Sequence, residues 1–161
     1  NSRNQVEMTT DPIDGEGVMA AAQGELWGGM PAETIMGHIH LHVSDLEEAD
    51  TFYRKLLGYE LVCEYGGQAL FLSTGKYHHH IGMNTWNGVG APAPSENSVG
   101  LREYSISIPN EGYKQNIIRS LEQLGLTYVE ENGVLHTKDP SQNSIALYVE
   151  PMPASAPAAR A

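Results

Sequence analysis

The most regular part of the chain is residues 37–43, where three histidines alternate with three aliphatic residues. Successive side chains of a β-strand point to opposite faces, so Ile39, Leu41 and Val43 are predicted to share the core face. Residues 78–86 show a similar alternation, with Ile81 and Met83 on the core side. The opposite face of these two strands is then predicted to carry His38, His40, His42, His78 and His80.

A helix is predicted between these strands. Apolar residues recur at helical spacing over 46–57, Asp45 is a suitable N-cap, and Gly58 stands where a left-handed C-terminal cap belongs. Residues 59–65 and 68–73 are predicted strands separated by the Gly66-Gly67 turn. The predicted order of this first module is βαβββ.

The same order recurs further along the chain. A strand at 101–108, a helix capped by Asn110 and closed by Gly125, and strands at 127–131, 134–137 and 143–149 follow a connector rich in Pro, Gly and Asn. Corresponding positions are 65 to 67 residues apart, which indicates an internal duplication. The predicted fold class is α+β: two paired βαβββ modules forming a curved mixed β-sheet cup with the helices outside.

The predicted organisation is a linker or arm over residues 1–35, one domain over 36–150 with modules at about 36–88 and 99–150, and a disordered tail over 151–161. Within the arm, Leu26, Trp27 and Met30 are the apolar exceptions. We expect them to pack on the surface of the domain, because large apolar residues rarely stay in water.

Composition narrows the function classes. The chain has 161 residues and a formal net charge of -11, which argues against nucleic acid or an anionic membrane as a partner and favours a small-molecule ligand. No stretch approaches the length of an apolar membrane span. The lone Cys63 fits a reducing compartment, so we expect a cytoplasmic protein. The chain opens at Asn1 rather than Met, so it is a candidate piece of a longer protein.

Two histidine clusters in phase indicate a metal site, because imidazole is a common metal ligand near neutral pH. The duplication places His38 opposite Glu103, and two histidines with one carboxylate are a facial ligand set for Fe(II), which also suits Mn or Zn. We therefore predict His38, His80 and Glu103 as metal ligands. Two alternatives remain: a solvated histidine face without a ligand, and Glu103 as an exposed strand-end acid beside Arg102.

The other histidines are expected to play different parts. His40, His42 and His78 share the predicted face but lie one pleat repeat, roughly 6 to 7 Å, further along. They are expected around the metal or on the substrate. His79 falls on the core-side phase and is expected to be dispensable, unless a β-bulge shifts the register.

Three motifs resemble the vicinal oxygen chelate superfamily, which contains glyoxalase I, bleomycin-resistance proteins and extradiol dioxygenases. They are Gly-His-Ile-His-Leu-His-Val-Ser-Asp-Leu at 37–46, Phe-Tyr-Arg-Lys-Leu-Leu-Gly-Tyr at 52–59 and Asp-Pro-Ser-Gln-Asn-Ser-Ile at 139–145. Residues 77–86 are most similar to the C-terminal domain of two-domain catechol 2,3-dioxygenase-like proteins. Residues 9–14 resemble the interdomain linker of those proteins, which implies an upstream domain or, failing that, a homo-oligomer.

The resemblance implies a divalent metal, Fe(II) first and Mn, Zn or Ni as alternatives, that chelates two neighbouring substrate oxygens. His38 matches the first-strand metal histidine of the family. Ala146 stands where the family commonly has a ligand Glu. His40, His78 and Tyr148 are of the residue types that such dioxygenases place near the substrate, so they are our candidate catalytic residues.

The expected function is an enzyme of aromatic catabolism that opens the ring of a catechol with O2. Two alternatives stay open. One is a glyoxalase-like lyase or isomerase that uses a metal without O2, and the other is a non-catalytic small-molecule-binding domain, which the alanine at position 146 keeps in consideration.

Overall fold

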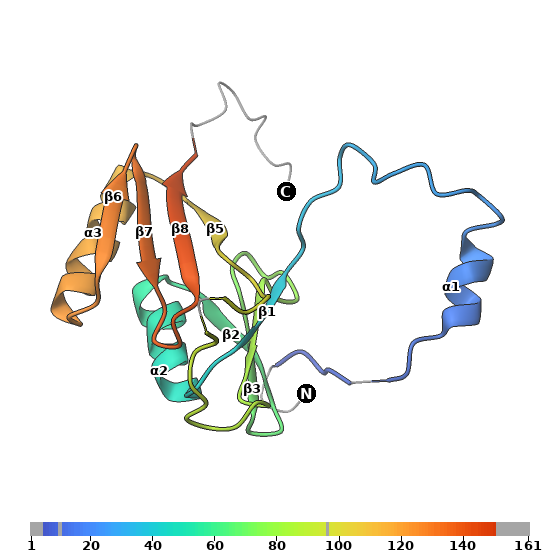
Figure 1. The fold of residues 1–161 in the computed structure, drawn as a ribbon, viewed down its shortest axis with the longest axis horizontal. Helices are drawn as coiled ribbons and strands as arrows, with labels where there is room; N and C mark the ends of the chain where they lie inside the picture. The colour runs from blue at the N-terminus through green and yellow to red at the C-terminus, as the bar shows by residue number, and fades with distance from the viewer. Residues whose placement is uncertain (1–4, 10, 96, 151–161) are drawn as a thin grey trace.

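The computed structural model describes residues 5–9, 11–95 and 97–150 (Figure 1). They form an α+β fold with two four-stranded mixed sheets, as the sequence predicts. Sheet A has the strand order β1-β4-β3-β2, and sheet B has the order β5-β8-β7-β6. The strands are β1 (Ile39–His42), β2 (Glu60–Tyr65), β3 (Ala69–Ser73), β4 (Ile81–Asn84), β5 (Tyr104–Ile108), β6 (Tyr128–Glu131), β7 (Val134–Lys138) and β8 (Ser144–Val149).

The two sheets repeat one pattern. In each module the first strand is parallel to the fourth and the other pairs are antiparallel. Leu41 is opposite Met83 in sheet A, and Ile106 is opposite Leu147 in sheet B. The two βαβββ modules that the duplication predicts are therefore present.

The predicted caps set the bounds of the helices. The Asp45 side chain accepts hydrogen bonds from the backbone N–H groups of Glu47 and Glu48 at the start of α2 (Leu46–Asp50). The chain continues without a break into a π-helix, η1 (Thr51–Leu56), where a single α-helix was expected. The π-helix ends at Leu56, and Gly58 follows it with a φ of +73°, a conformation that glycine adopts without strain. Asn110 caps α3 (Glu111–Gln123) in the same way.

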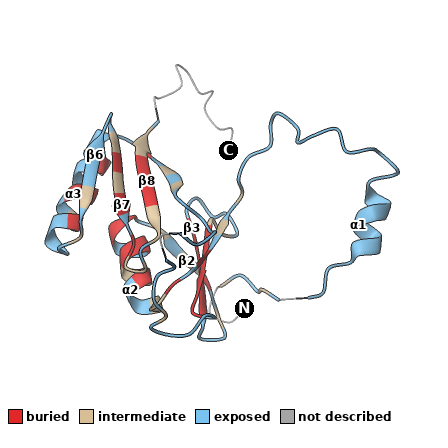
Figure 2. Ribbon diagram, in the orientation of Figure 1, coloured by how far each residue is buried: buried red, intermediate tan, exposed pale blue. Residues whose placement is uncertain are grey.

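One hydrophobic core serves both modules. The core-side residues of both sheets belong to a single cluster with the buried faces of α2, η1 and α3. Figure 2 shows buried residues, in red, on β7, β8, β3 and α2. Its members from the strands include Leu41, Leu72, Ile81 and Met83 in sheet A and Ile108, Leu135, Ile145 and Leu147 in sheet B.

A buried polar contact joins the modules inside this core. The Tyr53 hydroxyl on η1 donates to the Asp139 carboxylate at 2.8 Å and lies 2.7 Å from the Tyr104 hydroxyl on β5. Because Tyr53 has a single proton and gives it to Asp139, Tyr104 is the donor in the second bond. Burial raises the pKa of both tyrosines, so both remain protonated donors.

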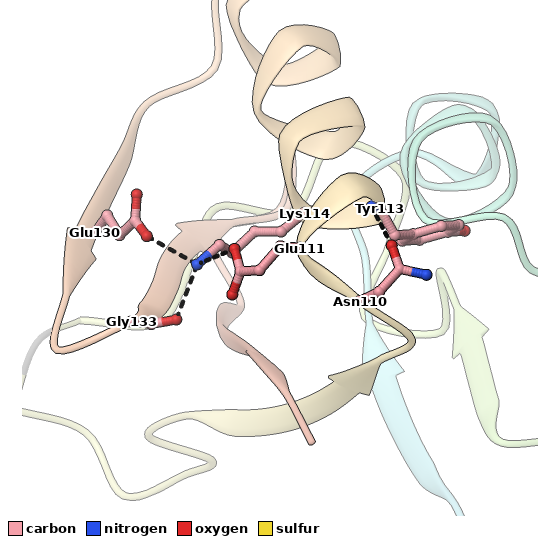
Figure 3. Close-up of polar contacts among 6 residues, drawn as sticks. All are labelled: Asn110, Glu111, Tyr113, Lys114, Glu130 and Gly133. Atoms are coloured by element: carbon pink, nitrogen blue, oxygen red, sulfur yellow. Dashed lines mark hydrogen bonds and ion pairs between the residues drawn. The ribbon is translucent and has the colours of Figure 1, made fainter. Parts of the chain in front are cut away.

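A buried lysine, paired with two partly exposed glutamates, fastens α3 to the β6–β7 hairpin (Figure 3). The Lys114 ammonium lies 2.8 Å from Glu130 and 2.9 Å from Glu111, and it donates to the carbonyl of Gly133 at 3.2 Å. The Lys114 side chain is only 3% exposed, and its three donors have three acceptors. This satisfied lysine is structural, because burial of a charge is tolerated when it is paired and hydrogen-bonded.

The N-terminal segment differs from its prediction in two ways. It contains a short helix, α1 (Gly15–Ala21), capped by Asp14, which projects away from the sheets (Figure 1). The expectation that Trp27 and its neighbours pack on the domain is wrong: Leu26 is 94% and Trp27 78% exposed. The contact comes earlier, where the Val6 N–H donates to the Val62 carbonyl on β2.

The predicted disordered tail, residues 151–161, lies outside the described residues. In the part of the chain that is described, no helix has the length and apolar character needed to cross a bilayer.

Tyr53→Phe should destabilise the whole domain. The change leaves Asp139 without one donor and Tyr104 without its acceptor inside the core, which should lower the free energy of unfolding by about 1–3 kcal/mol. Chemical denaturation of this variant, with Tyr65→Phe in the smaller core cluster as the control, measures the difference. Equal stability of the two variants would mean that the buried contact contributes nothing.

Candidate metal centre

Three histidines meet on the face of sheet A that points away from the shared core. Each of His38, His40 and His79 offers a ring nitrogen, and these atoms all lie within 4.8 Å of one another. Within residues 5–9, 11–95 and 97–150, no other group of three or more potential ligands comes together. We call these three residues the histidine triad.

The alternation in and just before β1 supplies two members of the triad. Leu41 is buried at 3% exposure, whereas His38, His40 and His42 are exposed, as the sequence predicts. The rings of His38 and His40 lie 5.3 Å apart, centroid to centroid. One face of the strand therefore presents the histidine side chains, and the other face packs into the hydrophobic core.

Glycine at position 82 makes room for His40. Gly82 on β4 is the register partner of His40, and a Cβ atom at Gly82 would lie 2.8–3.0 Å from the Cε1, Nδ1 and Nε2 atoms of that ring. Real Cβ contacts are essentially never shorter than 3.0 Å. The absence of a side chain at this position thus lets the imidazole lie flat against the sheet.

His79 is the third member, although we expected it on the core side. The strand β4 begins only at Ile81, so the alternation does not extend to residues 78–80. The His79 ring instead contacts His38, with centroids 4.4 Å apart, and Phe71 at 5.0 Å. Periodicity alone could not find this residue; only the run of three consecutive histidines marked the segment.

The hydrogen bonds of His79 fit a metal ligand. Its Nδ1 lies 2.8 Å from the Nδ1 of His78, whereas its Nε2 is buried and has no hydrogen-bond partner. A His79 tautomer with the proton on Nδ1 would donate to His78 and leave the Nε2 lone pair free. An unpaired buried acceptor is costly, and a metal ion is one partner that would satisfy it.

Two members of the triad, His79 and His40, are held toward the neutral form. Burial, followed by the neighbouring His38, His78, His40 and His80, lowers the pKa of His79 to about 4. Burial and the charge of His38 also lower the pKa of His40. Neutral imidazoles are the form that binds metals, so these residues fit the group that the sequence motifs imply.

His80, a predicted ligand, lies outside the triad. Its Nδ1 accepts a hydrogen bond from the Thr74 backbone N–H at 3.2 Å and lies 3.2 Å from the Ser73 hydroxyl. The ring also stacks on Tyr77, with centroids 4.7 Å apart. One of its two nitrogens is therefore already engaged by the β3 end.

Glu103, the other predicted ligand, lies on sheet B. It pairs with His136 of β7, Oε2 to Nδ1, at 3.0 Å. Tyr148, a candidate catalytic residue, is also on this sheet: it lies in β8, opposite Ser107 of β5. Neither Glu103 nor Tyr148 belongs to the group of ligands that the described residues bring together. Of the other two candidate catalytic residues, His40 is a member of the triad, and His78 contacts its member His79.

An apolar wall borders the triad. Phe71 contacts the rings of both His40 and His79 and belongs to a small cluster with Cys63 and Ala69, against which Met8 of the N-terminal segment packs. Burial raises the pKa of the Cys63 thiol, so this cysteine is an inert part of the wall. These buried side chains support the rings of His40 and His79 from one side.

A groove of about 930 Å³ is lined by one member of the triad, His40, and follows the free edge of β1. One side is formed by His40 and His42, and the other by the connector that precedes β5. The size suits a small aromatic molecule.

The fold defines the class of protein. No protein-family model matches the chain. Among solved structures, it matches a glyoxalase/bleomycin-resistance/dioxygenase domain from Frankia sp. EAN1pec with a TM-score of 0.58 and 16% identity, over 74% of this chain and all of that one. It also matches glyoxalase I of Leishmania major, with a TM-score of 0.55 and 19% identity, over 73% of this chain and 88% of that one. The chain therefore has the α+β fold of these glyoxalase and dioxygenase domains, which is the fold that the sequence motifs lead us to expect.

A curated relative gives a more specific comparison. The chain is 40% identical over 143 residues to a catechol-2,3-dioxygenase of Bacillus subtilis (strain 168). The match covers 88% of this chain but 50% of the relative, so the chain spans about half the length of the curated protein it matches.

Gly82→Ala should weaken metal binding without unfolding the domain. The added methyl group would displace the His40 ring, and disturbing the support of a ligand typically costs about 10- to 100-fold in metal affinity. Titration with Zn²⁺ measures the affinity. Gly15→Ala on α1, where a Cβ meets nothing within 4 Å, is the control. Unchanged affinity in Gly82→Ala would show that His40 is not a ligand.

Proposed function

We propose that this chain is the metal-binding half of an extradiol dioxygenase, which opens the ring of a catechol-type diol beside a hydroxylated carbon. The observation that carries the proposal is the histidine triad with its unpartnered, buried His79 Nε2. The identity to a catechol-2,3-dioxygenase supports the choice of reaction. Small-molecule diol and O2 are the two substrates.

The metal that we propose is Fe(II), with Mn, Zn and Ni as alternatives. Imidazole ligands suit Fe, Zn and Ni, whereas Mn favours carboxylate ligands. When bound, such an ion supplies a Lewis acid that stabilises negative charge on two neighbouring substrate oxygens and positions the reactants. His38, His40 and His79 would hold it.

The remaining residues of the site would orient the ligands and the substrate. His78 fixes the ring of His79 through the 2.8 Å contact between their Nδ1 atoms. His78 is exposed, so in this proposal it would exchange a proton with the diol, a role that histidine often has in catalysis. Phe71, which contacts the rings of both His40 and His79, would hold these two rings in place.

A second candidate function is a glyoxalase-like isomerase or lyase. The observation in its favour is that the triad contains no carboxylate, and an all-imidazole set also suits zinc and nickel. This enzyme would use the same residues to polarise a carbonyl without consuming O2.

We also propose that the working enzyme contains more than this chain. The match covers only half of the relative, and residues 9–14 resemble an interdomain linker. The Val6–Val62 hydrogen bond and the contact of Met8 with the apolar wall would connect an upstream domain to the metal centre. A homo-oligomer is the alternative source of a second body. The lone buried Cys63 fits a cytoplasmic location.

Single substitutions distinguish the triad from the ligand set predicted by strand phase. His38→Ala should empty the site under either scheme. If the triad binds the metal, His40→Ala and His79→Ala should reduce metal content to a small fraction, while His80→Ala and Glu103→Ala retain it. Inductively coupled plasma mass spectrometry of the purified proteins measures the content. A site emptied by His80→Ala and Glu103→Ala would instead favour the set His38, His80 and Glu103.

The reaction itself is tested with the iron-loaded protein and catechol. We expect one O2 consumed for each diol and a yellow ring-opened product, both lost in His38→Ala and kept in Arg119→Gln, which changes an exposed side chain on α3. Oxygen-electrode and absorbance traces recorded together provide the measurement. Isomerisation of a glyoxal–thiol adduct without O2 would favour the second candidate, and no turnover of either substrate would favour a non-catalytic binding domain.

A further inference from the structure

One row of residues crosses sheet A from strand to strand and includes a member of the triad. His40 of β1 is opposite Gly82 of β4, Gly82 is opposite Phe71 of β3, and Phe71 is opposite Cys63 of β2. Neighbouring strands are about 4.8 Å apart, so β1 and β3 are separated by about 10 Å. The rings of His40 and Phe71 are nevertheless in contact, with centroids 5.7 Å apart, because Gly82 places no side chain between them.

Phe71 forms a triangle of rings with two members of the triad. Its centroid lies 5.0 Å from that of His79, and the rings of His79 and His40 lie 5.5 Å apart. All three contacts are edge-to-face, with interplanar angles between 69° and 85°, an arrangement that aromatic rings prefer. Because Phe71 is only 9% exposed and interiors are close-packed, its ring cannot move without moving its neighbours.

The N-terminal segment, residues 5–9, contacts the far end of this row. Phe71 packs with Cys63 and Ala69, and Met8 packs against this small cluster. The segment is also fixed to β2, where the Val6 N–H donates to the Val62 carbonyl at 3.2 Å. β2 and β1 are the two opposite edges of sheet A. A chain of packed side chains therefore connects the segment at one edge with the triad at the other.

We propose that the N-terminal segment sets the metal affinity of the triad. Met8 is a positioning residue in this scheme: it holds Phe71, and Phe71 holds the rings of His40 and His79 at the spacing that binds an ion. Coupling between two sites is reciprocal, so a bound metal would tighten the docking of residues 5–9 by the same factor. The inference rests on the proposed function, since it concerns the control of the same metal centre.

Titration of the metal-free protein with Zn²⁺ tests the effect of the segment on affinity. Phe71→Leu should raise Kd about tenfold or more, as the loss of a group that orients metal ligands typically does. Met8→Ala keeps the Phe71 ring but removes its outer support, so Kd should rise less, by about threefold or more. Met8→Leu has a similar volume and should restore Kd to within about twofold of wild type.

Met19→Ala is the matched control, because it makes the same change at a methionine on α1 that is 75% exposed. It should leave Kd unchanged. The inference is overturned if Met8→Ala binds Zn²⁺ as tightly as wild type, or if Met19→Ala weakens binding as much as Met8→Ala does.

Hydrogen exchange measured by NMR tests the reciprocal effect. Saturating Zn²⁺ should slow exchange of the Val6 amide, which docks the segment on β2, by about threefold or more. The Val18 amide, which donates to the Asp14 carbonyl in α1, should exchange at the same rate with and without the metal. An unchanged Val6 rate would mean that docking and metal binding are independent.

A wild type that binds no Zn²⁺ would contradict the metal centre, and the metal-free protein then decides the inference by itself. Met8→Ala should shift the NMR signals of the His40 and His79 rings, because their support has moved, and leave those of His136 on sheet B in place. If the signals of His40 and His79 do not move, Met8 has no influence on the triad and the inference is wrong.

Discussion

The buried carboxylate of Asp139 is the constraint on which the arrangement of the two modules depends. It is 1% exposed and must be surrounded by donors, since an uncompensated buried charge is severely destabilising. Two donors are the backbone N–H groups of Ser141 and Asn143, and a third is the Tyr53 hydroxyl of the other module. The helix side of the first module is thereby held against sheet B, so the polar face of sheet A, with its histidines, is left outside the core.

Local signals in the sequence predicted most of the secondary structure. The two predicted helix N-caps, Asp45 and Asn110, accept hydrogen bonds from the first backbone N–H groups of their helices. The two predicted C-terminal glycines, Gly58 and Gly125, adopt the left-handed conformation. The alternation also put His38 and His40 on the correct face. It failed at His79, because alternation is imposed by strand pairing and β4 starts two residues later. The exposed Trp27 could not be predicted either, since apolar character indicates a preference for contact but not the partner.

The predicted ligand Glu103 illustrates a different limit. The duplication equates it with His38, and each does lie just before the first strand of its own sheet. A repeat in sequence, however, fixes equivalent places in two modules and not the way the modules pack. Packing is set by long-range contacts such as Tyr53 with Asp139, and His136, which no motif marked, holds Glu103 at 3.0 Å.

The histidine cluster has a charge balance that a cation would complete. Because the imidazoles lie within ring contact, each protonation disfavours the next, and burial lowers the pKa of His79 and His40 further. His79 and His40 are therefore held toward the neutral, metal-binding form, and leaving a buried acceptor such as His79 Nε2 unsatisfied costs about 1–3 kcal/mol. A solvated histidine face would not bury that atom. The combination of neutral rings, one orphaned nitrogen and a glycine that admits His40 is what a preformed cation site requires, and it distinguishes this face from a strand that merely carries histidines.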